Sequence, residues 1–115
     1  MRLLTKSIAA VAGGLALLCT GCAGPIYDWG SYEQSVYNMY KRADGFDVQA
    51  ELGQLTHEME KAQAAGKLVP PGKRIHVGYL AYLAGDNTTA RGYFEAEKQA
   101  FPESGAFVDF LMEGL

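Results

Sequence analysis

The side chains of this 115-residue chain that could carry chemistry are two neighbouring cysteines, two histidines and a scatter of carboxylates. Cys22 ends an apolar segment, where a thiol is a nucleophile that an enzyme can acylate. His57 and His76 lack the spacing that would place two imidazoles on one helix face around zinc. The sequence therefore predicts a modification site at Cys22, no metal site and no cofactor.

The carboxylates give no catalytic pattern. Glu58 and Glu60 are two residues apart and cannot share a helix face, whereas Glu51 and Glu58 can. A solvated helix face explains these carboxylates better than a catalytic pair, which needs burial to separate its two pKa values. No Gly-x-Ser-x-Gly elbow and no phosphate-binding glycine loop occurs. We predict that the protein is not an enzyme, and the enzymatic alternative would need a buried carboxylate such as Glu97.

The N-terminus is typical of a cleaved signal. Arg2 and Lys6 precede the apolar stretch 8–18, which at 1.5 Å per residue is too short to cross ~30 Å of hydrocarbon. We therefore expect a signal peptide over residues 1–21.

The cleavage region resembles the lipobox of bacterial lipoproteins, in which the cysteine after the cut carries the lipid. Thr20 and Gly21 are the small residues before Cys22, while Cys19 stands where that motif usually has Leu. The resemblance implies lipidation of Cys22. The alternative is an ordinary secretory signal, cut elsewhere, that leaves a free cysteine.

Removal of residues 1–21 leaves 94 residues and takes away two of the ten basic side chains, so eight basic face thirteen acidic residues and the net charge is about −5. This charge excludes a basic groove for nucleic acid and a polybasic membrane patch. Membrane attachment must then come from the lipid on Cys22. Cys22 would also be the only remaining cysteine, which excludes an internal disulfide.

Residues 22–28 are predicted to be a short lipidated tether of at most ~20 Å, followed by a single domain over 29–115. Apolar spacing, turns and caps predict an all-α bundle of about five helices. Ser31 and Gln34 would form a capping box, Asp47 would cap the second helix, and helices would stop at Gly66 and Gly85. The first helix is expected to begin near Ser31 and reach Lys41, the second to follow Asp47 and end near Gly66, and the third to cover about 74–83. The fourth follows the stop and cap at 85–88 and is ended by Pro102, and a last short helix starts at Ser104-Gly105.

Two of these helices carry predictions about their buried faces. In the first, Tyr32, Val36 and Tyr40 are expected on the core side. In the last, Phe107, Phe110 and Leu111 are expected to point inward. No segment shows the period-two alternation of a strand.

The segment 78–102 resembles a tetratricopeptide unit, because small and large residues stand at that repeat's spacings. The matching residues are Gly78, Gly85, Ala90, Phe94 and Pro102. The resemblance implies two αα-hairpins followed by a short C-terminal helix. The alternative is an ordinary tight αα-hairpin, which also needs small residues at its crossing.

Five pieces of the mature chain resemble an uncharacterised family of small Gram-negative lipoproteins, a domain of unknown function. The pieces are Tyr27-Asp28-Trp29-Gly30, Tyr32-Glu33, Tyr37 to Tyr40, Pro70-Pro71-Gly72 and Phe101-Pro102-Glu103-Ser104. The resemblance implies a gene beside that of a lipoprotein similar to the curli secretion channel, and so a shared envelope assembly. Ala23 after the lipidated cysteine implies export to the outer membrane, on its periplasmic face.

The exposed aromatic and proline residues are the expected partner-binding residues: Trp29, Tyr37, Pro70 and Pro71. Alternatively, these rings close one end of the bundle, and the prolines only fix an angle between helices. The sequence thus predicts a non-enzymatic scaffold lipoprotein that binds another envelope protein. The alternative is a binder of a lipid or peptidoglycan fragment, with a cleft lined by Tyr79, Tyr82 and Tyr93.

Overall fold

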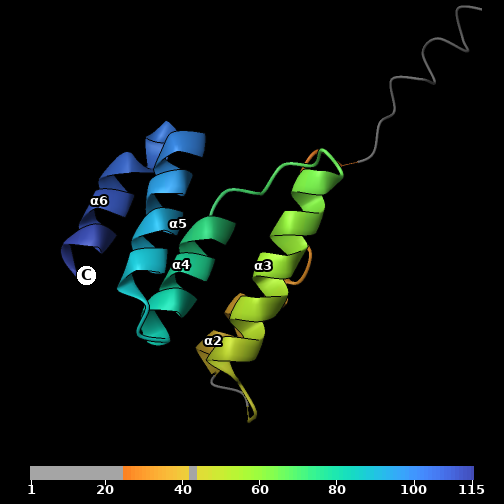
Figure 1. Ribbon diagram of the computed structural model, residues 1–115, viewed down its shortest axis with the longest axis horizontal. Coiled ribbons are helices and arrows are strands. Elements are labelled where there is room, and N and C mark those ends of the chain that lie inside the picture. The colour runs from red at the N-terminus through yellow and green to blue at the C-terminus, as the bar shows by residue number, and fades with distance from the viewer. Residues whose placement is uncertain (1–24, 42–43) are drawn as a thin grey trace, which may run out of the picture.

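Helices account for most of the structure, a computed structural model that describes residues 25–41 and 44–115 (Figure 1). They are α2 (Tyr32–Lys41), α3 (Val48–Ala64), α4 (Lys73–Leu83), α5 (Asn87–Ala100), the short η1 (Pro102–Ser104) and α6 (Gly105–Glu113). These residues contain no strand, only an isolated parallel bridge between Tyr27 and Leu68. The predicted all-α fold is confirmed, while the expected signal peptide and Cys22 lie outside the described residues.

The helix ends follow the local sequence. The Asp47 carboxylate caps α3 by accepting hydrogen bonds from the backbone N–H groups of Gln49 and Ala50, at 2.9 and 3.2 Å. Asp86 caps α5 through Thr89 N–H, at 3.0 Å. The predicted stops at Gly66 and Gly85 are confirmed as well. The N–H of the residue after each glycine donates to a carbonyl in the last turn of the helix: Lys67 to Ala62, and Asp86 to Ala81.

α4 and α5 form the most closely packed pair, joined by a short turn. Gly78 of α4 lies against α5, and a Cβ at this position would be 2.7 Å from the Phe94 ring and 3.2 Å from the carbonyl oxygen of Ala90. Phe94 is buried with Ala81, Ala90 and, from α6, Val108. The absence of a side chain at Gly78 is therefore what allows the two helices to approach.

A second cluster of apolar side chains joins the first two helices to α4. Leu55 of α3 packs with Val77 and Leu80, and Tyr32 and Met39 of α2 cover this cluster. Figure 1 shows α4 between α5 and α3. α4 thus contributes to both cores, as expected for a helix that is apolar around much of its circumference.

α2 buries its predicted face only in part. Tyr32 packs on the core and Val36 is partly buried, as expected, but Tyr40 is 81% exposed and Ser35 is only 1% exposed. Apolar spacing did not predict that the most deeply buried residue of α2 is a serine. Its hydroxyl lies 2.8 Å from Nε2 of His76, which makes its burial possible.

The orientation of α6 also differs from the prediction. Phe107 and Phe110 are exposed, at 54% and 67%, and Val108 is buried in their place. α6 packs on α5 along one stripe that includes Val108, Leu111 and Met112. Within the described residues, Phe107 and Phe110 lie outside this contact stripe and stay at the surface.

Candidate functional site: a tether latch and an apolar groove

A tight turn leads into α4 and positions its first residue. The backbone N–H of Lys73 donates to the carbonyl of Pro70 at 3.3 Å, and Gly72 has φ 88° and ψ −21°. With Pro71 second and a left-handed glycine third, this is a type II turn. Glu97 of α5 stabilises this turn, because its Oε1 accepts a hydrogen bond from the Gly72 N–H at 2.7 Å.

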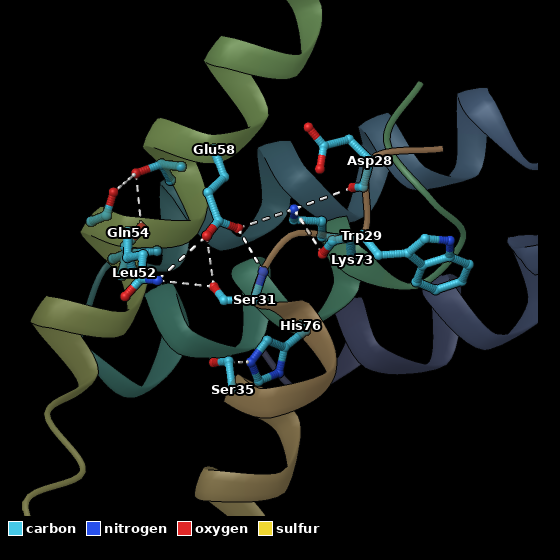
Figure 2. A network of polar contacts seen from close by, with 11 residues as sticks. Asp28, Trp29, Ser31, Ser35, Leu52, Gln54, Glu58, Lys73 and His76 are labelled. Atoms are coloured by element: carbon cyan, nitrogen blue, oxygen red, sulfur yellow. Dashed lines mark hydrogen bonds and ion pairs between the residues drawn. The ribbon is translucent and has the colours of Figure 1, made fainter. Parts of the chain in front are cut away.

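Lys73 is completely buried and points at the chain that precedes α2. Its Nζ lies 3.3 and 3.5 Å from the carbonyl oxygens of Trp29 and Asp28 and 3.4 Å from Oε2 of Glu58 (Figure 2). A buried ammonium requires such partners, because it has lost its hydration. The lysine therefore ties α3 and α4 to the segment before α2.

Glu58 receives further hydrogen bonds on the other side of this pair. Ser31 donates to it twice, from its backbone N–H at 3.1 Å and from its hydroxyl at 2.8 Å, and Gln54 donates at 3.4 Å. Burial alone would raise the pKa of Glu58, but these hydrogen bonds and the charge of Lys73 together hold that pKa below its ordinary value. We call Ser31, Gln54, Glu58 and Lys73 the latch.

The latch overturns two sequence expectations. Glu58 does not belong to a solvated helix face, since it pairs with the buried Lys73. Ser31 and Gln34 form no capping box, because Ser31 is engaged by Glu58 while the Gln34 amide donates to Asn38. Gly30 makes the close approach possible, as it has φ 50° and a Cβ there would collide with the Glu58 carboxylate.

Beside the latch lies a buried pair, Ser35 and His76, shown with it in Figure 2. Burial lowers the pKa of His76, although the negative charge of Glu51 acts in the opposite direction. The ring of Tyr32 lies 5.7 Å from the imidazole, centroid to centroid. Of the two histidines, His57 is thus exposed, while His76 is buried and hydrogen-bonded.

An apolar groove lies beside the N-terminal half of α4. It has a volume of about 350 Å³ and is lined by Tyr32, Val36 and Met39 of α2, Gly72, Ile75, His76 and Tyr79 at α4, Phe94 of α5, and Phe107 and Leu111 of α6. This lining contains no Asp, Glu, Lys or Arg. The site thus suits an apolar ligand or partner.

Tyr79 also lines two hollows next to the groove. It lines a neighbouring hollow of about 170 Å³ with Tyr82 and Leu115, and another of about 490 Å³ with Met39 and Tyr40. The rings of Tyr79 and Tyr82 stack, with centroids 6.2 Å apart. The groove and these two hollows, which we call the groove face, form one apolar surface across α2, α4 and α6.

The sequence-predicted site residues are not gathered at one place. Trp29 stacks on Tyr32 beside the latch, while the exposed Tyr37 lies on α2 with the Lys41 ammonium 5.8 Å from its ring centroid. Pro71 is exposed, but Pro70 is fully buried. The prediction that Pro70 is a surface residue is therefore wrong, because it belongs to the buried part of the turn that supports Lys73.

The ligand cleft predicted from three tyrosines is present in part. Tyr79 and Tyr82 line the groove face, whereas Tyr93 is half-buried against the core shared by α3 and α4. Glu97, the carboxylate named for the enzymatic alternative, is 1% exposed beneath the Gly72 turn, with its Oε2 3.9 Å from the Arg74 guanidinium. Glu97 is therefore buried because it holds the turn at Gly72.

Sequence reasoning missed the latch, and one signal could have revealed it. Lys73 directly follows a proline-glycine turn at the start of a helix, where a positive charge opposes the helix dipole. A lysine at so unfavourable a position suggests a specific partner. The identity of that partner depends on the packing of α3, which spacing along the chain does not show.

Two further findings concern the part of the chain that the structure describes. None of the helices there is both long and apolar enough to cross a bilayer. Nor do three or more His, Cys, Asp or Glu side chains gather there in a geometry suited to a metal ion.

Comparison with known proteins gives a family. No curated protein and no solved structure matches the chain. The model of one family, described as a domain of unknown function, matches residues 26–111. This match begins at the segment that pairs with Leu68 and ends within α6, so it includes the latch and every residue that lines the groove. The chain belongs to the DUF4810 family.

Proposed function

We propose that the protein is a non-enzymatic lipoprotein, anchored by a lipid on Cys22 to the periplasmic face of the outer membrane, that binds another envelope protein through the groove face. The observation that carries the proposal is the continuous apolar surface across α2, α4 and α6, with Tyr79 at its centre. The lipid anchor rests on the signal and lipobox pattern of residues 1–22.

The arrangement of the helices supports a tetratricopeptide-like interpretation. Gly78 and Ala90 let α4 and α5 approach, and Phe94 fills the space between them, as the repeat pattern implies. The close helix pairing that such a repeat needs is present between α4 and α5, whereas α2 packs on α4 rather than closely on α3, so the interpretation covers the α4–α5 hairpin with α6 after it. Helical repeats bind partners on concave surfaces, and the groove beside α4 is such a surface.

The exposed aromatic residues also favour a protein partner. Interfaces are enriched in tyrosine, phenylalanine and methionine and depleted in charge at their centres. Tyr79, Phe107 and Met39 meet this description, and all three line the groove. The family resemblance implies as partner another envelope lipoprotein, similar to the curli secretion channel.

A second candidate is the binding of a small apolar ligand. The groove volume of about 350 Å³ lies within the range of ligand pockets. Its uncharged lining favours an acyl chain over a peptidoglycan fragment, which would need several polar groups. A shift in melting temperature with a monoacyl lipid, in the absence of any protein partner, would favour this candidate.

Phe107 and Phe110 provide a matched pair of variants for the test. Both are exposed on α6, but only Phe107 lines the groove. Cross-linking residues placed at 79 and 91 in the full-length protein in living cells would probe the groove and the exposed Arg91 position of α5. We expect one protein adduct at 79 and none at 91.

The Phe107→Ser variant should weaken that adduct, while Phe110→Ser should leave it unchanged. Equal losses in the two variants, or equal labelling at positions 79 and 91, would contradict the groove as the binding site. Fractionation of the same cells tests the anchor, because Cys22→Ala should move the protein from the membrane to the soluble fraction.

A further inference from the structure

The segment before α2 does not leave the domain as a free tether. The Asp28 N–H donates to the Leu68 carbonyl at 2.9 Å, and the Leu68 N–H donates to the Ile26 carbonyl at 3.1 Å. Lys73 then holds the carbonyls of Asp28 and Trp29 (Figure 2). The chain is therefore bound to the domain from Ile26 onward.

Very little chain separates this bound segment from Cys22. Only Ala23, Gly24 and Pro25 lie between Cys22 and Ile26. At about 3.5 Å per residue, the Cα atoms of Cys22 and Ile26 can be at most ~14 Å apart. A lipid on Cys22 would thus bring Ile26 to the headgroup region of the bilayer.

The surface at this point is apolar and exposed. Ile26, Leu68 and Trp29 are 69%, 54% and 42% exposed, and the backbone bridge places Ile26 beside Leu68. Figure 2 shows the indole of Trp29 directed away from Glu58 and Lys73. Tryptophan joins a large apolar ring system to one N–H donor, which suits a lipid–water interface. The adjacent Lys67 is exposed and can pair with anionic headgroups.

We propose that the edge formed by Ile26, Trp29 and Leu68 rests on the bilayer, with the lipid–water interface as its partner. This inference rests on the lipid anchor of the proposed function and extends it. The latch then acts as an orienting device, because it converts a short lipidated tether into a fixed attachment. As a consequence, the groove face is held at a constant angle to the membrane.

Trp29 is the only tryptophan of the chain and reports directly on this contact. The full-length gene product would be purified from membranes, weighed by intact mass spectrometry and reconstituted in phosphatidylethanolamine–phosphatidylglycerol vesicles that contain brominated lipid. We expect bromine to quench Trp29 emission, with a larger loss for bromines near the glycerol end of the acyl chain than near its terminal methyl.

Three variants make the experiment specific. Ile26→Asp with Leu68→Asp should abolish most of the quenching, whereas Phe110→Asp, which changes an exposed phenylalanine of α6, should not affect it. A 30-residue Gly/Ser insertion after Ala23 leaves the domain intact and should also reduce quenching, because it lowers the effective concentration of the edge at the surface. Circular dichroism checks that each variant is folded.

The outcomes separate this inference from the proposed function. An acylated protein whose Trp29 is not quenched, or whose quenching is the same in all variants, overturns the orientation and leaves the anchor in place. A mass without acyl chains at Cys22 overturns the anchor and the orientation together. Quenching that follows the variant order above supports both.

Discussion

The two ends of α4 are held by opposite kinds of interaction. Toward its C-terminus, Gly78 and Ala81 meet α5 in a close apolar contact with Phe94. At its N-terminus, Lys73 and His76 are buried among polar groups of α2, α3 and the preceding segment. The apolar end depends on shape and the polar end on charge and protonation. The hairpin should therefore be the rigid base of the molecule and the latch its condition-dependent part.

The largest effect should follow a change in the hairpin. Phe94→Ala removes a ring that is 2% exposed and leaves a cavity opposite Gly78. We expect a loss of about 4 kcal/mol in the free energy of unfolding, measured by urea denaturation. A loss below about 1 kcal/mol would mean that this end collapses easily, and the comparison would fail.

A single isosteric change in the latch should lower the free energy of unfolding by less than Phe94→Ala does. Glu58→Gln leaves the fully buried Lys73 without its counter-charge. We expect a loss of about 2 kcal/mol, below the usual value for buried pairs because Glu58 is partly exposed.

The double variant Lys73→Met with Glu58→Met provides the control for this change. It removes both charges and should recover most of the stability of the single variant. It should also free the segment 26–29, which amide hydrogen exchange at Asp28 would detect. A double variant as unstable as the single one would show that the pair contributes more than charge neutralisation.

A third change tests the serine that α2 buries. Ser35→Ala leaves Nε2 of His76 without its hydrogen-bond partner. The expected loss is about 1–2 kcal/mol, read from the urea midpoint. Ser104→Ala, which removes a hydroxyl bonded only to the Phe101 carbonyl at the start of α6, is the comparison and should lose less.

The smallest effect should be a dependence of stability on pH. Burial lowers the pKa of His76 below its ordinary 6.5, so on acidification the unfolded chain takes up this proton before the folded chain does. Stability should be full above about pH 6.5 and fall as the pH drops through and below that value. Glu58, whose folded pKa is lowered from 4.5, should add a second loss below about pH 4.5.

Urea midpoints between pH 5 and pH 8 would measure the first of these losses. His76→Asn should flatten the profile, while replacement of the exposed His57 by Asn should leave it unchanged. An unchanged slope in His76→Asn would assign the pH dependence to groups outside the latch region.

Local sequence was sufficient for much of the fold. The caps at Asp47 and Asp86, the stops at Gly66 and Gly85 and the small residues of the α4–α5 crossing all act within a few residues or between adjacent helices. Their roles follow from backbone geometry and apolar spacing, which are readable along the chain. The lipobox pattern at Cys22 is local in the same sense and predicts the anchor without any tertiary information.

The site was predictable only in fragments. Tyr79 and Tyr82 were recognised as ligand-facing, but Phe107, expected in the core, forms one wall of the groove. Spacing indicates which residues share a helix face and leaves open which face has a neighbour. Among the described residues α6 packs on α5 through Val108, Leu111 and Met112, and Phe107 lies beside that contact, where it faces the groove.

The sequence by itself determined most of the helices and their ends and the tight hairpin, and it predicts a lipid anchor. The tertiary structure alone decided that Ser31, Glu58 and Lys73 meet, that α2 buries Ser35 and leaves Tyr40 exposed, and that four helices line one groove. The physical reason is the separation along the chain of the groups that must meet. Caps and crossings are satisfied between neighbours in the chain, whereas a buried ion pair requires a partner 15 residues away on another helix, and only packing brings the two together.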